Sequence, residues 1–224
     1  ERESGWAGKF RRMPYGRGGI EAVTHRPDLP GGAGSYEWGG LGFLGDDTFA
    51  EQRPGWYLPV HELLVENNVA VFFHGHDHFY AQQELDGVIY QECPVPAQLN
   101  DGLGFCIRGK YTEGVILPNS GHLRVTVAPD ATTVEYVRSL LPEYESDEAG
   151  YNGDLADRYV ISDCDGDHIP DAHDLLKGYS ADCNLNDVPD ECDIALGTST
   201  DINGSGVPDE CEGLGDLNCD GTTN

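Results

Sequence analysis

The C-terminal part of the chain repeats with a strict period of 19 residues. Asp163, Asp182 and Asp201 are 19 residues apart. Two further series keep the same spacing: Pro170, Pro189 and Pro208, and Asp171, Asp190 and Asp209. A unit of this length is little more than one turn-rich loop and cannot bury a core of its own. Residues 163–212 therefore need cross-links or bound ions to hold a fixed structure.

The repeated side chains are rich in oxygen. In register the three units read DCDGDHIPD, DCNLNDVPD and DINGSGVPD, with oxygen-bearing side chains at positions 1, 3, 5 and 9. This spacing resembles the first part of a calcium loop, and carboxylates this dense repel one another unless a cation lies between them. The predicted Ca²⁺ ligands are Asp163, Asp165, Asp167, Asp171, Asp182, Asn184, Asn186, Asp190, Asp201, Asn203, Ser205 and Asp209. We expect the units to lack the full EF-hand pattern, with its bidentate Glu at position 12.

The repeats resemble thrombospondin type 3 repeats and the short acidic repeats of secreted bacterial proteins. The last nine residues, DLNCDGTTN, resemble the opening of a dockerin calcium loop. That resemblance implies Asp216, Asn218 and Asp220 as further ligands, and a cohesin-like or cell-surface partner for the tail. The alternative is a disordered acidic linker, which the phased Pro, Asp and Cys residues argue against.

Charge divides the chain. It carries 40 acidic and 13 basic residues in all, but 22 acidic and only 2 basic residues follow residue 140. The asymmetry indicates a domain boundary, and it argues against a nucleic-acid partner because phosphate groups would be repelled. We expect a first domain at 1–140, an acidic linker at 141–162, three calcium repeats at 163–212 and a truncated dockerin-like start at 213–224.

Five of the seven cysteines lie in the acidic part. No CxxC pair occurs, so the spacing favours disulfides over a zinc ribbon and indicates an oxidising compartment, secreted or at the cell surface. Two pairings are plausible, Cys164 with Cys183 and Cys192 with Cys211, although sequence leaves the connectivity open. No apolar stretch reaches the roughly 20 residues of a transmembrane helix.

Both ends of the chain look cut. It opens with ERESGWAGKF, without an initiator Met or the apolar segment of a signal peptide, and it closes within a motif. We expect a piece of a longer protein.

The first 140 residues contain a few clear structural signals. Trp56, Val60, Leu63 and Leu64 are spaced for one face of a helix, and the run VAVFF that follows suits a buried strand. Asp86-Gly87 lies between two alternating segments and predicts a β-hairpin. A second hairpin is expected to turn at Pro129-Asp130, and residues 1–55 are Gly-rich and read as long loops.

Histidines gather after the predicted strand, in the sequence His74-Gly75-His76-Asp77-His78. One interpretation is a polar strand end whose histidines have only structural partners. A second is the metallo-β-lactamase motif His-x-His-x-Asp-His, but the spacer before the aspartate is missing. A third is the terminal Gly-His-x-His of a dinuclear metal centre, which residues 75–78 match directly after an apolar strand.

The surrounding sequence extends the third match. YGRGGIEA, YEWGG, FAEQRPGWYLPVHELLVENNVAVFFHGHDHFYAQQELDGVIYQE and SGHLRVTV resemble the C-terminal half of bacterial calcineurin-like metallophosphoesterases related to purple acid phosphatases. The resemblance implies an α/β fold, a four-layer α/β/β/α sandwich of which this chain holds the β-rich second half. It also implies hydrolysis of phosphate esters by two metal ions of the Fe, Zn or Mn type, with His76 ligating one ion and His78 the other. His74 is expected to lie in the core or to support the ligands.

The match to that family is incomplete. Its Asp-x-His and Gly-Asn-His motifs, which supply further ligands, have no counterparts before the histidine loop. We therefore expect poor binding of the metal pair and no catalysis by this chain alone. Arg17 and Arg53 are candidates for contacting a phosphorylated small molecule or another phosphoester, with local pairing as the alternative. A different class of function is a non-catalytic, calcium-binding surface or adhesion protein with a phosphatase-like scaffold.

Overall fold

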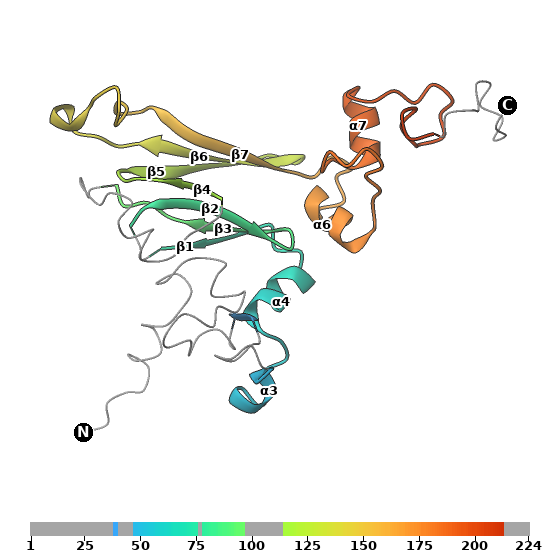
Figure 1. Ribbon diagram of the computed structural model, residues 1–224, viewed down its shortest axis with the longest axis horizontal. Helices are drawn as coiled ribbons and strands as arrows, with labels where there is room; N and C mark the ends of the chain where they lie inside the picture. The colour runs from blue at the N-terminus through green and yellow to red at the C-terminus, as the bar shows by residue number, and fades with distance from the viewer. Residues whose placement is uncertain (1–37, 40–46, 76–77, 97–113, 213–224) are drawn as a thin grey trace. The chain divides into compact units, whose positions relative to one another are not determined.

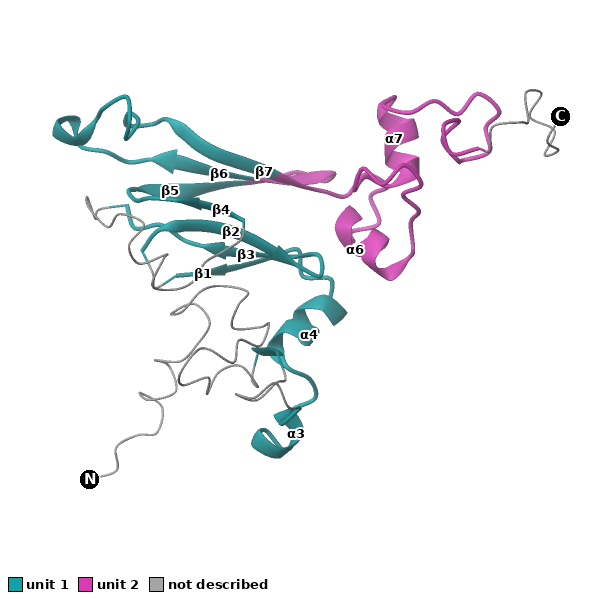
Figure 2. Ribbon diagram, viewed as in Figure 1, with its two compact units in different colours: residues 1–125, 134–159 teal, residues 126–133, 160–224 magenta. Residues whose placement is uncertain are grey.

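The computed structural model describes residues 38–39, 47–75, 78–96 and 114–212 of the chain (Figure 1). These residues belong to two compact units (Figure 2). The first unit comprises residues 1–125 and 134–159, and the second comprises residues 126–133 and 160–224. The described part is β-rich, with two sheets and few helices, which confirms the predicted β-rich character of the chain.

The first sheet has four strands: β1 (Val71–His74), β2 (Tyr80–Leu85), β3 (Val88–Glu92) and β4 (Val115–Leu117). Their order is β1-β3-β2-β4, with β1 parallel to β3 and the other neighbours antiparallel. Because β1 and β3 run in the same direction, their carboxyl ends meet at one edge, where His74 pairs in register with Glu92. The histidine loop begins at that edge.

The predicted hairpin at Asp86-Gly87 is confirmed. Strands β2 and β3 flank this two-residue turn, and both turn residues have positive φ angles, 49° and 77°. Such angles match the turn type that suits the right-handed twist of a hairpin, and Asp and Gly adopt them readily. Every residue of β3 is buried, so the turn fixes the register of a core strand.

The predicted helix is also confirmed, as α4 (Val60–Glu66), which follows the short helix α3 (Phe49–Gln52). Val60, Leu64 and Val65 of α4 pack on a core cluster of Trp38, Val88 and Tyr90. Polar contacts join α4 to the same hairpin. The Nδ1 atom of buried His61 lies 2.8 Å from the Tyr90 hydroxyl, and its Nε2 lies 2.9 Å from an Asp86 carboxylate oxygen.

The second sheet has three strands, in the order β5 (Gly121–Val127), β6 (Ala131–Arg138) and β7 (Leu155–Ser162). The predicted hairpin between β5 and β6 is present. Its alternation is only half reflected in burial: Val134 and Tyr136 of β6 are fully buried, whereas Val125 and Val127 of β5 are exposed.

Strand β7 was missing from the sequence analysis, which assigned residues 141–162 to an acidic linker. The structure places a 3-10 turn at Pro142–Tyr144 and the strand from residue 155. Alternate residues such as Tyr159 and Ile161 are half-buried, while Arg158 and Val160 between them are exposed. The acidic run before the strand hid this short period-2 pattern.

Aromatic residues connect the two sheets within the first unit. The rings of Tyr80 in β2 and Tyr136 in β6 stack with 4.6 Å between centroids, and the Tyr80 hydroxyl donates to Asp157 in β7 at 2.5 Å. Burial, followed by the hydrogen bond to the Asp157 carboxylate, raises the pKa of Tyr80 far above its ordinary value.

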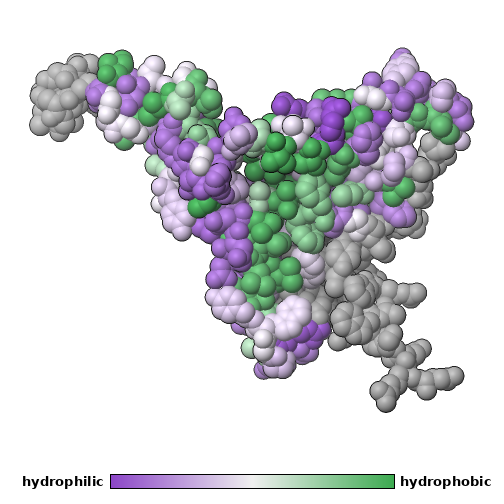
Figure 3. All heavy atoms as spheres, turned by 180° about the vertical axis from the view of Figure 1, so that it is seen from behind, coloured by the Kyte–Doolittle hydropathy of each residue, from purple (hydrophilic) through white to green (hydrophobic). Residues whose placement is uncertain are grey.

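Apolar residues form a continuous area on one face of the first unit (Figure 3).

The second unit repeats a loop followed by a short helix. Helices α6 (Asp171–Lys177) and α7 (Asp190–Leu196) each start directly after a proline and end at a glycine in the left-handed conformation. Proline suits the start of a helix because it lacks the N–H that would be unsatisfied there, and glycine at the end takes φ near +70° without strain. The 19-residue period is therefore a loop–helix period.

Candidate cation-binding sites

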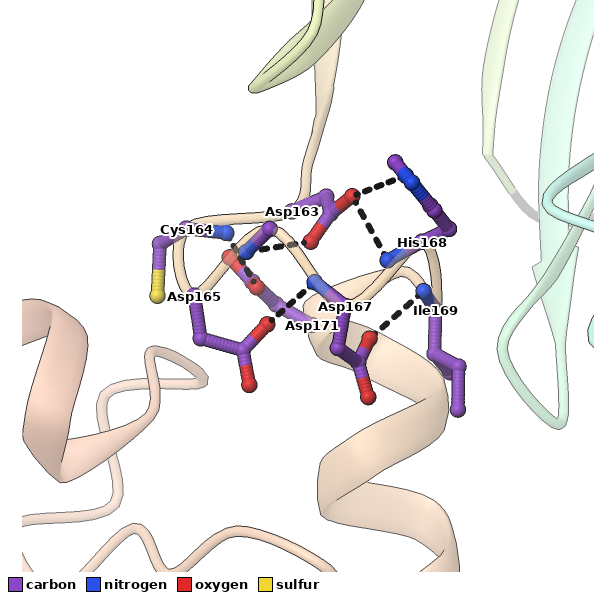
Figure 4. A network of polar contacts seen from close by, with 8 residues as sticks. Asp163, Cys164, Asp165, Asp167, His168, Ile169 and Asp171 are labelled. Atoms are coloured by element: carbon purple, nitrogen blue, oxygen red, sulfur yellow. Dashed lines mark hydrogen bonds and ion pairs between the residues drawn. The ribbon is translucent and has the colours of Figure 1, made fainter.

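One aspartate folds each acidic loop. In the first loop, Asp163 at position 1 accepts hydrogen bonds from the backbone N–H groups of Gly166 at 2.9 Å and His168 at 3.1 Å (Figure 4). In the second and third loops, Asp182 and Asp201 accept from the backbone N–H groups at positions 5 and 6. The two oxygens of one carboxylate thus accept hydrogen bonds that fold the loop around position 1.

The side chains at positions 3 and 5 continue the curl. Asp165 accepts from the N–H of Asp167 at 3.1 Å, and Asp167 accepts from the N–H of Ile169 at 2.7 Å. The second and third loops repeat these bonds through Asn184, Asn186, Asn203 and Ser205. In the first loop, carboxylate oxygens of Asp163, Asp165 and Asp167 lie within 4.8 Å of one another. The structure brings the predicted ligands of positions 1, 3 and 5 together.

Position 9 has a different geometry from the other predicted ligands. An oxygen of Asp171 accepts the N–H of Cys164 at 2.9 Å, and Asp190 accepts the N–H of Cys183 at the same distance. Asp209 accepts the N–H of Ile202 at 3.0 Å. Each carboxylate therefore ties the end of its loop back to position 2, which is a structural role.

Sequence analysis missed the carboxylates at position 12. Counting from Asp163, Asp182 and Asp201, this position holds Asp174, Asp193 and Glu212. The expectation that the units lack the Glu of the EF-hand pattern at position 12 is wrong for the third repeat, which carries Glu212, and the first two repeats carry Asp there. The signal is present in the sequence, because the three acids keep the 19-residue period.

In the second and third loops, the position-12 side chains contact positions 3 and 5. The amides of Asn184 and Asn186 donate to one oxygen of Asp193, at 3.1 and 2.9 Å. In the third loop, Asn203 and Ser205 donate to Glu212 at 2.8 and 2.6 Å. The hydroxyl of Ser205 also lies 3.3 Å from the carbonyl oxygen of Val207 at position 7. Positions 3, 5 and 12 thus converge in the second and third loops, as the ligands of a calcium loop do, and position 7 joins them in the third.

Asp174 in the first loop lacks such donors. Its side chain is 3% exposed, and its Oδ1 atom is buried without a hydrogen-bond partner among the described residues. Burial, followed by the charges of neighbouring aspartates, raises the pKa of Asp174 to about 6. By contrast, hydrogen bonds from Thr198 and then from the two asparagines lower the pKa of Asp193. The first loop therefore has an unmet demand for positive charge.

Two disulfides connect successive repeats, and their pairing differs from the expected one. Cys164 bonds to Cys192 and Cys183 bonds to Cys211, with Cα atoms 5.8 and 5.9 Å apart. Each bond joins position 2 of one unit to position 11 of the next. The expected pairs, Cys164 with Cys183 and Cys192 with Cys211, would have joined like positions, which the loop–helix geometry does not bring together.

The pairing of the two disulfides explains why two positions of the repeat lack the expected cysteine. Position 11 of the first unit has no earlier unit to bond to, and it holds His173, which is fully buried. Position 2 of the third unit holds Ile202 instead of cysteine, and Ile202 is 84% exposed. The three repeats therefore form a cross-linked set that stops at both ends.

The histidine loop is described only in part. Strand β1 ends at His74, whose Nδ1 lies 2.6 Å from Oε2 of Glu92, and both side chains are buried. This agrees with the expectation that His74 is a core or supporting residue. His78 is exposed and has a φ of 65°, whereas His76 lies outside the described residues. Among the described residues, the acidic and cysteine clusters that could hold a metal lie in the second unit and do not include His78.

Of the remaining predicted site residues, Arg53 makes local contacts and the others lie outside the described residues. The Arg53 guanidinium donates to the carbonyl oxygen of Gln52 at 2.7 Å and lies 5.9 Å from the centre of the Trp56 ring. These contacts match the local-pairing alternative for Arg53. The residues outside the described part are Arg17, Asp216, Asn218 and Asp220.

Comparison with known proteins adds no identification. No family model matches the chain, and no curated protein or solved structure matches it either. Within the described residues, we find no helix with both the length and the apolar character needed to cross a membrane.

Proposed function

We propose that residues 163–212 bind calcium ions in three consecutive loops. The observation that carries this proposal is the carboxylate at position 12, which recurs in all three repeats as Asp174, Asp193 and Glu212. With positions 1, 3 and 5 it completes a set of oxygen donors of the kind that calcium prefers. Sulfur ligands do not compete, because the nearby cysteines are joined in disulfides.

Each position has a defined task in this proposal. The oxygens at positions 1, 3, 5 and 12 bind the ion, with the carbonyl oxygen of position 7 as a further donor. Position 9 positions the loop through its bond to the backbone of position 2. A bound ion neutralises carboxylates that otherwise repel one another, so binding and folding of each loop are coupled.

Calorimetric titration of the whole chain tests the proposal. We expect Ca²⁺ to give a saturable calorimetric signal and to sharpen the far-ultraviolet circular dichroism, and Mg²⁺ to bind more weakly because it demands a stricter octahedral geometry. The variant Asp174→Asn should weaken or abolish binding at the first loop. Asp130→Asn, which removes the same charge from an exposed turn, is the matched control. Equal affinity in both variants would rule out Asp174 as a ligand.

We place this calcium array outside the cell or on its surface, because the two disulfides persist in an oxidising environment. A rigid array of this kind suits a stalk or an adhesion segment, and residues 213–224 are proposed as a dockerin-like segment with a cohesin-like or cell-surface partner. Pull-down of a cohesin domain by the whole chain, with and without calcium, tests that partner.

A second candidate function is hydrolysis of phosphate esters at a dinuclear metal centre in the first domain. It is favoured by the edge where β1 and β3 end together, since His74 and Glu92 form a buried pair there and His76 and His78 follow His74 closely in the sequence. We propose these two histidines as ligands of separate Fe, Zn or Mn ions, in the second half of a four-layer α/β/β/α sandwich. Two metals of this kind would stabilise the attacking and leaving oxygens at phosphorus.

Metal analysis and activity assays test this second function. A longer form of the protein that supplies the missing ligands should bind two equivalents of metal and hydrolyse p-nitrophenyl phosphate. The double variant His76→Ala/His78→Ala should lose both properties, whereas His122→Ala, at an exposed position in β5, should keep them. Full activity in the double variant would contradict the proposed ligands and favour the non-catalytic scaffold.

A further inference from the structure

We propose that the three acidic loops are not equivalent: the first requires a bound cation to close, whereas the second and third are closed by hydrogen-bond donors of their own. This inference rests on the proposed calcium function and deepens it. It predicts one tight site and two weaker ones within a single array. The contacts at position 12 carry the argument.

The first loop contains only acceptors at its centre. Positions 1, 3, 5 and 12 are all aspartates, and the backbone N–H groups that the loop supplies are bound by Asp163, Asp165 and Asp167. No donor is left for Oδ1 of Asp174, and this atom is buried without a hydrogen-bond partner among the described residues. The ring of His168 does not fill the gap, because its Nδ1 lies 3.8 Å from Asp163 and its side chain is 88% exposed.

The second loop satisfies its position-12 carboxylate internally. One oxygen of Asp193 accepts from the amides of Asn184 and Asn186, and the other accepts from the Thr198 hydroxyl at 2.6 Å. The amide of Asn184 also lies 3.5 Å from a carboxylate oxygen of Glu210 in the next repeat. An entering cation has to displace these donors from the carboxylate, which opposes binding.

The third loop also supplies hydrogen-bond donors to its own position-12 carboxylate, from different residues. Asn203 donates to both oxygens of Glu212, at 3.0 and 2.8 Å, and the Ser205 hydroxyl donates to one of them. Without an ion, the loop therefore keeps its turn and its position-12 contact. A cation here replaces existing bonds, while in the first loop it fills a place that no donor occupies.

The number of carboxylates in each loop also favours tighter binding at the first loop. Positions 1, 3, 5 and 12 supply four carboxylates in the first loop, but only two in the second, Asp182 and Asp193, and two in the third, Asp201 and Glu212. Calcium affinity in loops of this kind depends on the count of charged ligands. Higher charge also raises the repulsion that the empty loop must bear, so the same loop gains most from binding and loses most without it.

The test compares two reciprocal variants in the whole chain. Asp165→Asn/Asp167→Asn gives the first loop the amides of the second, and Asn184→Asp/Asn186→Asp gives the second loop the four carboxylates of the first. Calcium titration is followed by calorimetry and by backbone amide resonances of Gly166 for the first loop, Asn186 for the second and Gly204 for the third. Intact disulfides and far-ultraviolet circular dichroism confirm that each variant is folded.

In the unmodified chain we expect Gly166 to respond at the lowest calcium concentration and to broaden in chelator, while Gly204 keeps its position without calcium. The first variant should raise the dissociation constant of the tight site by about tenfold or more, and the second variant should create another tight site. Equal affinities in all three loops, or an unchanged tight site in the first variant, would overturn the inference and leave calcium binding intact. The absence of any calcium response in the unmodified chain would overturn the proposed function itself. If the first variant fails to fold, the second still decides the matter, because no gain in affinity at Asn186 contradicts the inference.

Discussion

The two units of this chain are stabilised by different interiors. In the first unit the buried residues are largely apolar and aromatic, including Val88, Tyr90, Val134 and Tyr136. In the second unit the buried side chains are mainly polar or paired in disulfides, among them Asp171, Asp174, Asp190, Asp193 and Cys192. The stability of sheets with an apolar core depends little on bound cations, whereas an interior of carboxylates depends on hydrogen bonds, cross-links and cations.

The comparison shows why the period of 19 residues is compatible with an ordered structure. A repeat that buries little apolar surface can still be fixed if each unit is tied at several points to itself and to its neighbour. Position 9 ties the helix start to the loop, the disulfides join adjacent units, and position 12 closes the loop. Each of these ties can be removed by its own substitution. The stability of the second unit can therefore be measured independently of that of the first.

The largest expected effect is on the apolar unit. Tyr136→Ala removes a fully buried ring, its stacking on Tyr80 and its hydrogen bond to the carbonyl oxygen of Pro118. We expect a loss of about 3–5 kcal/mol from the free energy of unfolding of the first unit. Urea denaturation followed by tyrosine fluorescence measures it. Tyr57→Ala, at a side chain that is 74% exposed, should change it by less than about 0.5 kcal/mol.

Removal of a disulfide should affect only the acidic unit. The double variant Cys164→Ser/Cys192→Ser opens a link that spans 28 residues of sequence, and we expect a loss of about 2–4 kcal/mol in the second unit. Hydrogen exchange of the helix α6 and α7 amides reports this loss, and the amides of β3 serve as the internal control. Equal loss of protection in β3 would show that the two units do not unfold independently.

A smaller effect is expected at position 9. Asp190→Ala removes the buried carboxylate that accepts the N–H of Cys183, and a hydrogen bond to a charged group contributes about 1.5–3 kcal/mol. The variant should destabilise the second loop even in saturating calcium, because the lost bond positions the loop. Asp130→Ala at an exposed turn is the control. Full rescue of Asp190→Ala by calcium would indicate that position 9 is not a structural tie.

The most local effect, confined to one loop, is a dependence on pH in chelator. The pKa of Asp174 is raised to about 6 in the folded loop, above the value near 4 of an unfolded aspartate, so folding favours the protonated form. The stability of the ion-free first loop should therefore fall as pH rises from about 4 to about 6 and level off above that. Exchange of the Asp167 amide measures the trend, which saturating calcium should reverse. Increasing stability over the same interval would show that the carboxylate is already compensated.

Sequence patterns predicted the parts of the fold whose signals are local. The Asp86-Gly87 turn, helix α4 and the β5–β6 hairpin each follow from a few neighbouring residues. Strand β7 was missed because its alternation is short and follows an acidic run. The exposure of Val125 and Val127 was not predictable, since a period-2 pattern does not say which face of a strand is covered.

The candidate cation sites were predictable to a similar extent. Positions 1, 3 and 5 are close in sequence, and the structure brings them together. The disulfide pairing needed the three-dimensional path of the loop–helix unit, which spacing alone cannot supply. The role of position 9 was equally hidden, because a carboxylate that binds a backbone N–H and one that binds an ion look the same in a sequence.

The most direct test of the calcium array is a crystal structure of the whole chain grown with calcium. The account predicts an ion in the first loop at about 2.3–2.6 Å from oxygens of Asp163, Asp165, Asp167 and Asp174. It also predicts that Asp171 keeps its bond to the N–H of Cys164. A structure at saturating calcium with no ion in that loop, and with the Asp174 carboxylate satisfied by protein donors instead, would contradict it.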